Sequence, residues 1–460
     1  PNPVNKRNKV IYQKSDNRAE ARKVQYIGSL FRGTVSWLEL PNERQLQAYT
    51  AACYRNTPYS KSNELVTNIP AGNPIPDSIG KYSPLKHVFY IIKENRTYDQ
   101  VLSDVAGGDG DTSLLLFGDS ITPNQHKIVK DFVLLDHFYV EAEVSADGHN
   151  WSTAAYANDY TEKTWPVSYG GRGGNYDYEG QKNIAWPQNG FIWDYCRKLN
   201  INYRTYGEFA DDYKANIPSL VGQFCPYFTS WDERVRDTTR FYQWRQDFDS
   251  LVAINKLPAL NTLRFINDHT EGTRVGRPTP YAHVADNDYA VGLFIEHLSH
   301  SPVWKQSVVF ILEDDAQNGP DHIDAHRSTA YVVGPYVKRN FVDHTPYTTS
   351  SMLRTIELIL GIPPMSQYDA GATPMWRCFT DTANFQPFKS VCPKVNLDEV
   401  NKGYAWHNLK SEELNLSKED LIPDGLMNEI LWKALKGDNK PIPAVTKAAW
   451  VISIPYKTKK

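Results

Sequence analysis

Apolar runs alternate with helical patterns over most of this chain. From Lys86 onward the β-type runs are "HVFYII", "FVLLDHFYV", "INYRTYG", "NTLRFI", "SVVFIL" and "TAYVVGPYV". Between them lie segments with helical periodicity, among them "DNDYAVGLFIEHLSHS" and "TTSSMLRTIELILG". Continuous apolar strands separated by helices are typical of a sheet that is buried on both faces. The pattern therefore predicts an α/β fold with a mostly parallel sheet sandwiched by helices.

The residues before Lys86 have a different pattern. "GTVSWLEL" alternates like a strand, and "PNERQLQAYTAACYRN" predicts a helix opened by Pro41. The Pro- and Gly-rich stretch "NIPAGNPIPDSIGKYSP" then predicts a linker. We therefore divide the chain into a small N-terminal module with its linker, residues 1–80, and an α/β domain, residues 81–460. The polar tail from about Val395, with one predicted helix "LMNEILWKAL", is expected to pack on the outside.

The composition excludes some classes of protein. Among 460 residues, 50 are basic and 53 acidic, so the net charge of −3 gives no electrostatic footprint for nucleic acid. No apolar run approaches the roughly 18 residues of a membrane span. The start, "PNPVNKRNKV", is neither a signal peptide nor a lipidation motif, and is either a mature terminus or the cut edge of a longer protein. Cys378 and Cys392 are close enough in sequence to staple a loop in an oxidising compartment, and five reduced thiols is the alternative.

Three of the β-type runs end in side chains that bind metals. These are Glu94 and Asn95 after the first run, Asp268 and His269 after "NTLRFI", and Asp314 and Asp315 after "SVVFIL". In open α/β sheets the functional crevice lies beyond the carboxyl ends of the strands. Carboxylates gathered there require a cation, and oxygen ligands suit a hard divalent ion, while histidines favour zinc or manganese. The alternative for any one of these acids is a solvated turn or a helix N-cap.

Two polar loops add further candidates. "AQNGPDHIDAHRS" carries Asp321, His322, Asp324 and His326 after the third strand end, where the histidines are either ligands, phosphate donors or surface residues. "EVSADGHNWS" contains Ser145 and His149, and a serine there could be a nucleophile. It is not a G-x-S-x-G elbow, which argues against an acyl hydrolase. A serine beside a metal can be activated by the cation itself.

Longer motifs now indicate a family. The segments "HVFYIIKENRTYDQVL", "LLDHFYVEAEVSADGHNWSTAA", "NDHTEGT", "TPYAHVADNDYAVGLFIEHLSHSPVW" and "SVVFILEDDAQNGPDHIDAHRS" resemble the phosphoesterase family of bacterial phospholipases C and acid phosphatases. That family belongs to the alkaline phosphatase superfamily, and the resemblance covers roughly residues 85–365. Residues 25–60 also resemble the segment that joins a YVTN-type β-propeller to this domain in one branch. The propeller is absent here, so the resemblance implies a propeller from the same precursor or its loss in this branch.

The resemblance implies a metal-dependent phosphoester hydrolase, phosphatase or phospholipase C-like, with an alkaline-phosphatase-like fold. Its metal ligands would be Glu94, Asn95, Asp314 and Asp315, together with Ser145, the metal-bound nucleophile that forms a phosphoseryl intermediate. One divalent ion is expected, Zn, Mn, Ca or Mg, acting on a small phosphorylated or phospholipid substrate.

The resemblance assigns the remaining candidates less directly. Charge on the transferring group would be held by Asn95, His149 and His322, with Arg96 as a phosphate clamp or a structural ion-pair partner. Asp268, His269, His322 and His326 occupy plausible positions for a second metal. The superfamily's Asp-x-x-x-His pair is not intact in "NDHTEGT", which puts that metal in doubt, and the same residues could bind phosphate directly.

Two rival functions and one location complete the expectations. The fold could be kept as a non-catalytic binding module, although all the proposed ligands and Ser145 are present. A sulfatase or phosphonate hydrolase of the same superfamily shares the motifs. Because the resembled family acts outside the cytoplasm, we expect an exported bacterial protein, secreted, periplasmic or at the cell surface.

Overall fold

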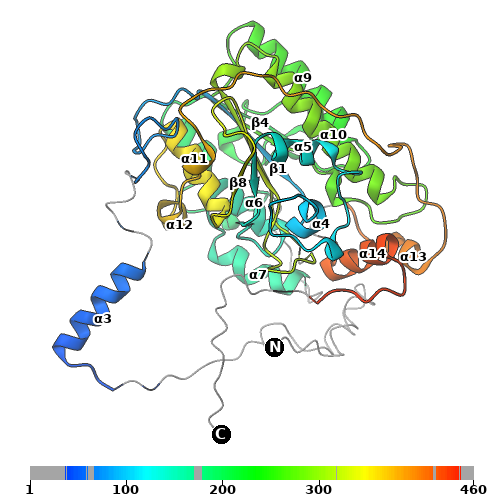
Figure 1. Ribbon diagram of the computed structural model, residues 1–460, viewed down its shortest axis with the longest axis horizontal. Helices are drawn as coiled ribbons and strands as arrows, with labels where there is room; N and C mark the ends of the chain where they lie inside the picture. The colour runs from blue at the N-terminus through cyan, green and yellow to red at the C-terminus, as the bar shows by residue number, and fades with distance from the viewer. Residues whose placement is uncertain are drawn as a thin grey trace.

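The structure is a computed structural model that describes residues 37, 39–57, 60, 67–169, 179–317, 319–417, 421–444 and 446. Helices and strands alternate through the main body (Figure 1). The strands are β1 His87–Lys93, β2 Val133–Leu135, β3 Phe138–Tyr139, β4 Tyr203–Tyr206, β5 Leu260–Arg264, β6 Ser307–Glu313, β7 Ala330–Val333, β8 Phe341–Asp343 and β9 Tyr347–Thr348. The helices are α3 Glu43–Asn56, α4 Tyr98–Leu102, α5 Pro123–Asp131, α6 Ser145–Ala154, α7 Asp159–Tyr169, α8 Ile192–Lys198, α9 Asp237–Ala253, α10 Pro280–Ser299, α11 Thr349–Leu360, α12 Gln367–Gly371, α13 Trp406–Glu412 and α14 Asp424–Lys436.

The core is a five-stranded sheet in the order β4-β5-β1-β6-β7. All neighbouring pairs are parallel except β6 with β7, which is antiparallel. The central strands β1, β5 and β6 consist of buried residues, save for the partly exposed first residue of β1. Such strands need cover on both faces, and the predicted α/β class with a mostly parallel sheet is confirmed.

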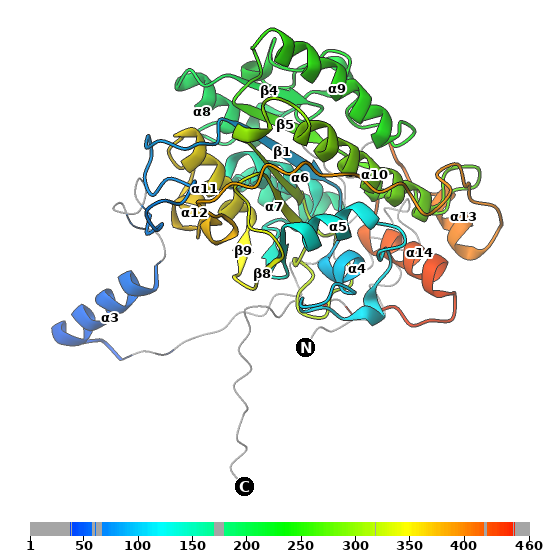
Figure 2. The ribbon, with the colours of Figure 1, turned by 45° about the horizontal axis from the view of Figure 1, so that its top comes forward.

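Helices α9 and α10 lie side by side and cover one face of the sheet (Figure 2). Phe89 of β1 packs on Trp244 and Phe248 of α9 and on Phe294 of α10. Helix α6 starts beyond the strand ends and packs against α11. The helix predicted from "TTSSMLRTIELILG" is α11, which the left-handed Gly361 ends.

The run "FVLLDHFYV" is two short strands rather than one. β2 pairs in parallel with β8, and β3 pairs in parallel with β9, so each forms its own two-stranded sheet. Asp136 and His137 lie between the two pairings. Two polar residues in the middle of an apolar run are the sequence signal for this break.

The N-terminal residues that are described form α3 and the segment from Thr67. Asn42 caps α3 with a reciprocal bond to Gln45, so the helix begins one residue after the cap rather than at Pro41. None of its residues is buried, and it stands apart from the body (Figure 1). In the predicted linker, Ile69 and Ile75 join the main core. The strand predicted from "GTVSWLEL" lies largely outside the described residues.

The C-terminal extension is more deeply packed than its sequence predicted. It forms two helices, α13 and α14, instead of one. Leu426, Met427, Ile430 and Leu431 of α14 form a buried cluster, and Trp432 packs with Phe117 in another. Apolar residues at this spacing make one face of α14 a buried stripe.

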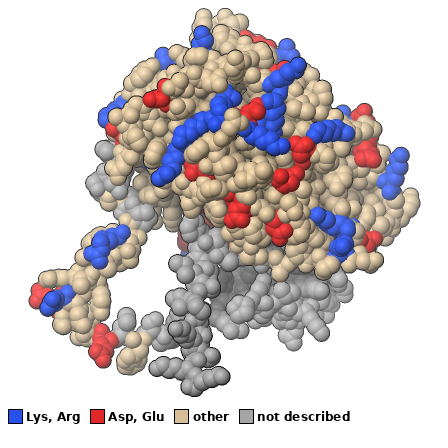
Figure 3. Space-filling model, in the orientation of Figure 1, with Lys and Arg blue, Asp and Glu red and all other residues tan. Residues whose placement is uncertain are grey.

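The five cysteines are free thiols, so the bridge between Cys378 and Cys392 is not formed. Cys378 is buried beside Asp343, whereas Cys392 is exposed. On the face drawn in Figure 3, acidic and basic side chains are interspersed, in keeping with the near-neutral charge. Within the described residues, no helix has the length and apolar character needed to cross a membrane.

Candidate active site

The carboxyl ends of β5, β1 and β6 lie next to one another, because these strands are neighbours in the sheet. Lys93, the last residue of β1, is in register with Glu313, the last residue of β6. Glu94 and Asp314 therefore leave the sheet side by side, and the expected meeting of the three strand ends is confirmed. Asn95 then adopts a left-handed backbone with φ of 62°, a conformation that asparagine tolerates better than most residues and that often marks a functional site.

Ser145 is the first residue of α6, and its side chain is buried at this edge. Its Oγ lies 2.9 Å from Asp315 Oδ2 and 3.3 Å from Asn95 Oδ1. The positive end of a helix dipole favours an anion at this position. Gly148 allows α6 to approach so closely, because a Cβ there would be 2.7 Å from the Asp314 carbonyl oxygen.

Glu94, His149 and Asp314 form a buried group with the spacing of metal ligands. One ligand atom from each lies within 4.8 Å of the others. His149 Nε2 is 3.5 Å from Glu94 and 3.6 Å from Asp314. Both carboxylate oxygens of Asp314, and Oε2 of Glu94, have no hydrogen-bond partner among the described residues. Buried carboxylate oxygens without donors are costly, so these residues fit a divalent cation.

The pKa values reflect the crowding of carboxylates. Burial, together with the charge of Glu94, raises the pKa of Asp314 well above its usual range, and burial together with Asp314 does the same for Asp315. Burial also opposes ionisation of Glu94, but His149 and Arg264 outweigh it and lower the pKa of Glu94 to about 2. A bound cation would remove the repulsion that disfavours the ionised aspartates.

A layer of buried ion pairs surrounds this group. Arg264, at the end of β5, donates to Glu94 at 2.8 Å and also pairs with Glu179. His149 Nδ1 lies 2.9 Å from Glu208, which fixes the orientation of the imidazole. Burial works against a charged His149, but Glu208 dominates and raises its pKa well above 6.5.

Asp268 was predicted as a metal ligand, and the structure places it in an ion pair instead. Its Oδ2 is 2.7 Å from Lys93 Nζ, and Lys93 is also 2.7 Å from Glu313. Its Oδ1 accepts from the Glu94 backbone and from Asn287. Asp268 therefore holds the ends of β1 and β5 together, and its charge is already balanced by the lysine.

His269 lies at the same edge but belongs to none of the metal-type groups among the described residues. Its Nδ1 is 2.7 Å from Glu233, and its ring packs edge-on against Trp231. Burial opposes its charged form, but Glu233 raises its pKa above 6.5. Its Nε2 is buried without a partner in the described part of the chain. This nitrogen could serve either as a ligand, as predicted, or as a hydrogen-bond donor.

Arg96 is a structural clamp in this structure. Its guanidinium donates to the backbone carbonyls of Asn95, Asp268 and His269. It also lies over the ring of Phe117, 5.3 Å from the centroid. These bonds tie two strand ends together and use most of its donors, so the predicted phosphate clamp is not supported.

His322 and His326 lie in neighbouring acidic groups. His322 Nδ1 is 2.6 Å from Asp99 and forms a metal-type group with Asp99 and Asp321, where Arg327 already supplies a positive charge. His326 lies between Asp324 at 2.7 Å and Glu143 at 3.2 Å. Neither of these two histidines belongs to the group formed by Glu94, His149 and Asp314.

Several residues in or next to the site were not predicted from the sequence. They are Glu179, Glu208, Glu233, Arg264 and Asp424. Arg264 had a usable signal, since an arginine within the apolar run "NTLRFI" must find a buried partner. Asp424 begins α14, and burial raises its pKa to about 7 although the charge of His269 opposes this. Nothing in the local sequence marks the three glutamates or Asp424.

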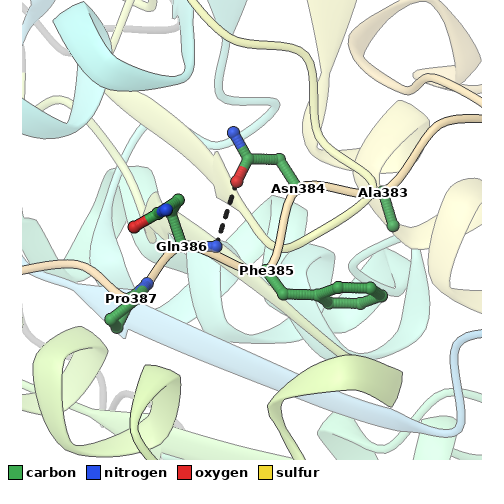
Figure 4. Close-up of a pocket in the computed structure, with 5 residues that line it drawn as sticks. All are labelled: Ala383, Asn384, Phe385, Gln386 and Pro387. Atoms are coloured by element: carbon green, nitrogen blue, oxygen red, sulfur yellow. Dashed lines mark hydrogen bonds between the residues drawn. The ribbon is translucent and has the colours of Figure 1, made fainter.

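A hollow of about 540 Å³ lies elsewhere, lined by Ala383, Asn384, Phe385, Gln386 and Pro387 (Figure 4). The side chain of Asn384 accepts a hydrogen bond from the backbone of Gln386 there. Its lining contains no ionisable group, so it offers no acid, base or metal ligand. The chemistry lies at the sheet edge instead.

The model of the Phosphoesterase family matches residues 105–363, more than half of the chain. This chain belongs to the Phosphoesterase family. The match spans α6, the end of β5 and the Asp314–Asp315 pair, and it confirms the resemblance to this family. The resemblance of residues 25–60 to a propeller-linked branch stays a prediction. Members of the Phosphoesterase family are hydrolases, so the chain is an enzyme acting on phosphoric ester bonds.

Solved structures similar to this Phosphoesterase member have low identity. A protein in the alkaline phosphatase superfamily from Vibrio parahaemolyticus has 15% identity and a TM-score of 0.45, covering 68% of this chain and 76% of its own. Human ectonucleotide pyrophosphatase / phosphodiesterase 5 has 11% identity and a TM-score of 0.43, and the match covers 65% of this chain and 100% of the human one. The lipoteichoic acid synthase LtaP from Listeria monocytogenes has 12% identity and a TM-score of 0.43, and the match covers 83% of this chain and 98% of that protein. These scores are too low to inform the chemistry of this chain. No curated protein matches it in sequence.

Proposed function

We propose that this protein is a metal-dependent phosphoester hydrolase in which Ser145 is the nucleophile. The position of Ser145 Oγ carries the proposal. It lies at the start of α6, 2.9 Å from Asp315 and 3.3 Å from Asn95, beside carboxylates with unpartnered oxygens. A hydroxyl surrounded by cation ligands at a helix N-terminus is well placed to lose its proton.

The residues that would hold the cation are Glu94, Asn95, Ser145, Asp314 and Asp315. His149 is close enough to join them or to contact the phosphoryl group. When bound, a divalent ion would lower the pKa of the serine hydroxyl and neutralise charge on the phosphoryl group. A donor set of oxygens with one imidazole suits Zn²⁺, Mn²⁺, Mg²⁺ or Ca²⁺.

The remaining steps follow from the chain's own side chains. Ser145 Oγ loses its proton to solvent and attacks phosphorus in line with the leaving group, so that the P–O bond to the leaving alcohol breaks, the alcohol departs and a phosphoseryl intermediate forms. Water then attacks the phosphorus, the P–Oγ bond breaks, and the serine hydroxyl is regenerated. His269 offers its unpartnered Nε2 to a phosphoryl oxygen, and Glu233, at 2.7 Å from Nδ1, favours the charged form of the imidazole by raising its pKa. Asn95 Nδ2 is also buried without a partner in the described structure and can serve the same purpose. A second cation is not part of the proposal, because Asp268 is paired with Lys93.

Substitution of the nucleophile tests this function. Ser145→Ala removes the attacking oxygen but not the carboxylates, so the fold should persist while hydrolysis falls by about 10³-fold or more. Ser250→Ala, on the exposed face of α9, is the matched control and should retain full activity. The substrates are nitrophenyl phosphate, bis-nitrophenyl phosphate, nitrophenyl phosphocholine and nitrophenyl sulfate, which separate a phosphatase from a phosphodiesterase, a phospholipase C-like enzyme and a sulfatase.

The outcomes separate the alternatives. Mass spectrometry of acid-quenched wild type should detect phosphate on the peptide that contains Ser145. Near-wild-type activity of Ser145→Ala would make water the nucleophile and overturn the covalent mechanism. A wild-type protein that binds a divalent ion yet hydrolyses none of the four esters would support the binding-module alternative.

A further inference from the structure

A second set of metal-type ligands lies at the edge of a different sheet. β2 and β8 pair in parallel, with Leu135 in register with Asp343. The residues that follow these two partners are Asp136 and His344, so both leave the sheet at the same edge. His137 comes next along the first strand. The register thus brings His344 to Asp136 and His137, from which it is separated by about two hundred residues in sequence.

The geometry of this group is that of a metal site. One ligand atom from each of Asp136, His137 and His344 lies within 4.8 Å of the others. His344 Nδ1 is 2.7 Å from Asp136 Oδ2, and the two imidazole centroids are 6.4 Å apart. The Asp136 side chain is fully buried, whereas those of His137 and His344 are 23% and 62% exposed. An ion can therefore enter from solvent and retain a water molecule.

One carboxylate oxygen of this group lacks a hydrogen-bond partner among the described residues. Asp136 Oδ2 accepts from the Asp109 backbone at 2.9 Å and from His344. Asp136 Oδ1 is buried and has no hydrogen-bond partner among the described residues. Buried carboxylate oxygens in native proteins are rarely left without a partner. A cation bound at this point would satisfy that oxygen.

The surrounding chain holds the ligands in place without a metal. Arg327 donates to the backbone carbonyls of Asp136 and Asp109, at 3.1 and 2.6 Å. Tyr347 donates its backbone N–H to the His137 carbonyl at 2.9 Å, and Tyr139 Oη lies 3.1 Å from His137 Nδ1. Ligands fixed in advance lose little entropy on binding an ion.

We propose that Asp136, His137 and His344 bind a divalent cation of the zinc class. Asp109 lies beside this group, with its Oδ2 3.7 Å from His137 Nε2 and its backbone N–H bound to Asp136 Oδ2. Two imidazoles with carboxylates favour Zn²⁺ over Mg²⁺ or Ca²⁺, which prefer oxygen ligands alone. This site shares no residue with the one around Ser145 and is independent of the proposed catalysis. Bound zinc would fasten β2 and β8 to the Asp109 loop.

Metal stoichiometry in the full chain tests the proposal. In an Asp315→Ala background, which disables the site around Ser145, we expect one equivalent of Zn²⁺ by isothermal titration. Co²⁺ should show the visible absorption bands of a histidine-containing site. His137→Ala with His344→Ala should abolish both signals, and His297→Ala, a partly exposed histidine on α10 that pairs with Asp249, should change neither.

Two measurements keep the test decisive if Asp315→Ala does not fold. Wild-type protein should bind one more equivalent of Zn²⁺ than the His137→Ala/His344→Ala variant, and Zn²⁺ should raise the unfolding temperature of the wild type by more. Equal stoichiometry and equal thermal shifts in the two proteins would overturn the proposal. Where Asp315→Ala does fold, a Co²⁺ spectrum that persisted after His137→Ala and His344→Ala were added to it would do so as well.

Discussion

At the scale of single residues, the site depends on a close approach between a helix and a strand end. Gly148 lies where a Cβ would be 2.7 Å from the carbonyl oxygen of Asp314 and 2.9 Å from its carbonyl carbon. Backbone atoms cannot move aside as a side chain can. A larger residue would therefore displace α6, and with it Ser145, from Asp315.

Gly148→Ala should separate the proposed nucleophile from its partners without unfolding the protein. We expect kcat/KM to fall by about 10²-fold, as misplacement of a reacting group by about 1 Å can cost. Steady-state kinetics on the best nitrophenyl ester measure this, with circular dichroism as a check of the fold. Gly118→Ala is the control, because its Cβ would meet only the side chains of Asp104 and Leu115. Equal activity of the two variants would contradict the close approach.

Individual site residues were predictable when they followed a strand directly. Glu94, Asn95, Asp314 and Asp315 follow β1 and β6, and parallel pairing delivers them to one edge. The partners of His322 and His326 could not be predicted, because a polar loop gives no register and nothing local reveals their contacts with Asp99 and Glu143. The ion pair of Asp268 was not predicted, because its partner Lys93 follows an apolar run and gives no local signal of a contact with Asp268. The contacts of Glu208 and Glu179 with the site could be identified only from the folded structure.

At the scale of elements, one helix caps another. The first turn of α5 has no side-chain cap of its own, since Thr122 makes none. Asp288 of α10 accepts instead from the backbone N–H groups of Asn124 at 3.0 Å and Gln125 at 2.8 Å. Burial outweighs these donors and raises the pKa of Asp288 to about 6. The cap is therefore sensitive to pH.

The direction in which pH changes the stability follows from the number of protons that Asp288 binds in the folded and unfolded states. Between about pH 6 and 3.8, native Asp288 holds a proton that the unfolded chain releases, so this group stabilises the fold increasingly as the pH falls. The free energy of unfolding of wild type, relative to Asp288→Asn, should grow by up to about 1 kcal/mol per pH unit across that window. Urea unfolding at several pH values measures it. A difference that does not change with pH would contradict the raised pKa.

The elements themselves were mostly readable from the sequence. The runs that became β1, β5 and β6 are apolar almost throughout, as buried parallel strands must be. The separate sheets of β2 with β8 and β3 with β9 were not predicted, because their partners lie far away in sequence and are only two or three residues long. The tail was expected outside, but α14 packs its apolar stripe into two clusters.

At the scale of the whole molecule, the thiols report on the compartment. Cys53 and Cys392 are exposed, while Cys196, Cys225 and Cys378 are buried, and burial raises the pKa of Cys196 to about 12. Two thiols should therefore react rapidly with Ellman's reagent in the native protein, and all five after unfolding without reductant. Only three after unfolding would indicate a disulfide and contradict the structure. The expected export now rests on the family resemblance, without support from a bridge.

The contacts of the C-terminal extension have a consequence for the order in which the enzyme is made. Asn428 of α14 donates to the Gln317 carbonyl at 2.8 Å, just past Asp315, and Ser411 accepts from the Thr273 backbone at 2.8 Å. Asn428 and Ser411 lie beyond the part of the chain that the family model matches. A ribosome synthesises Ser145 and both aspartates long before it reaches them. The nascent chain therefore carries its proposed nucleophile without these contacts until α14 has been synthesised, and we expect hydrolytic competence only after that point.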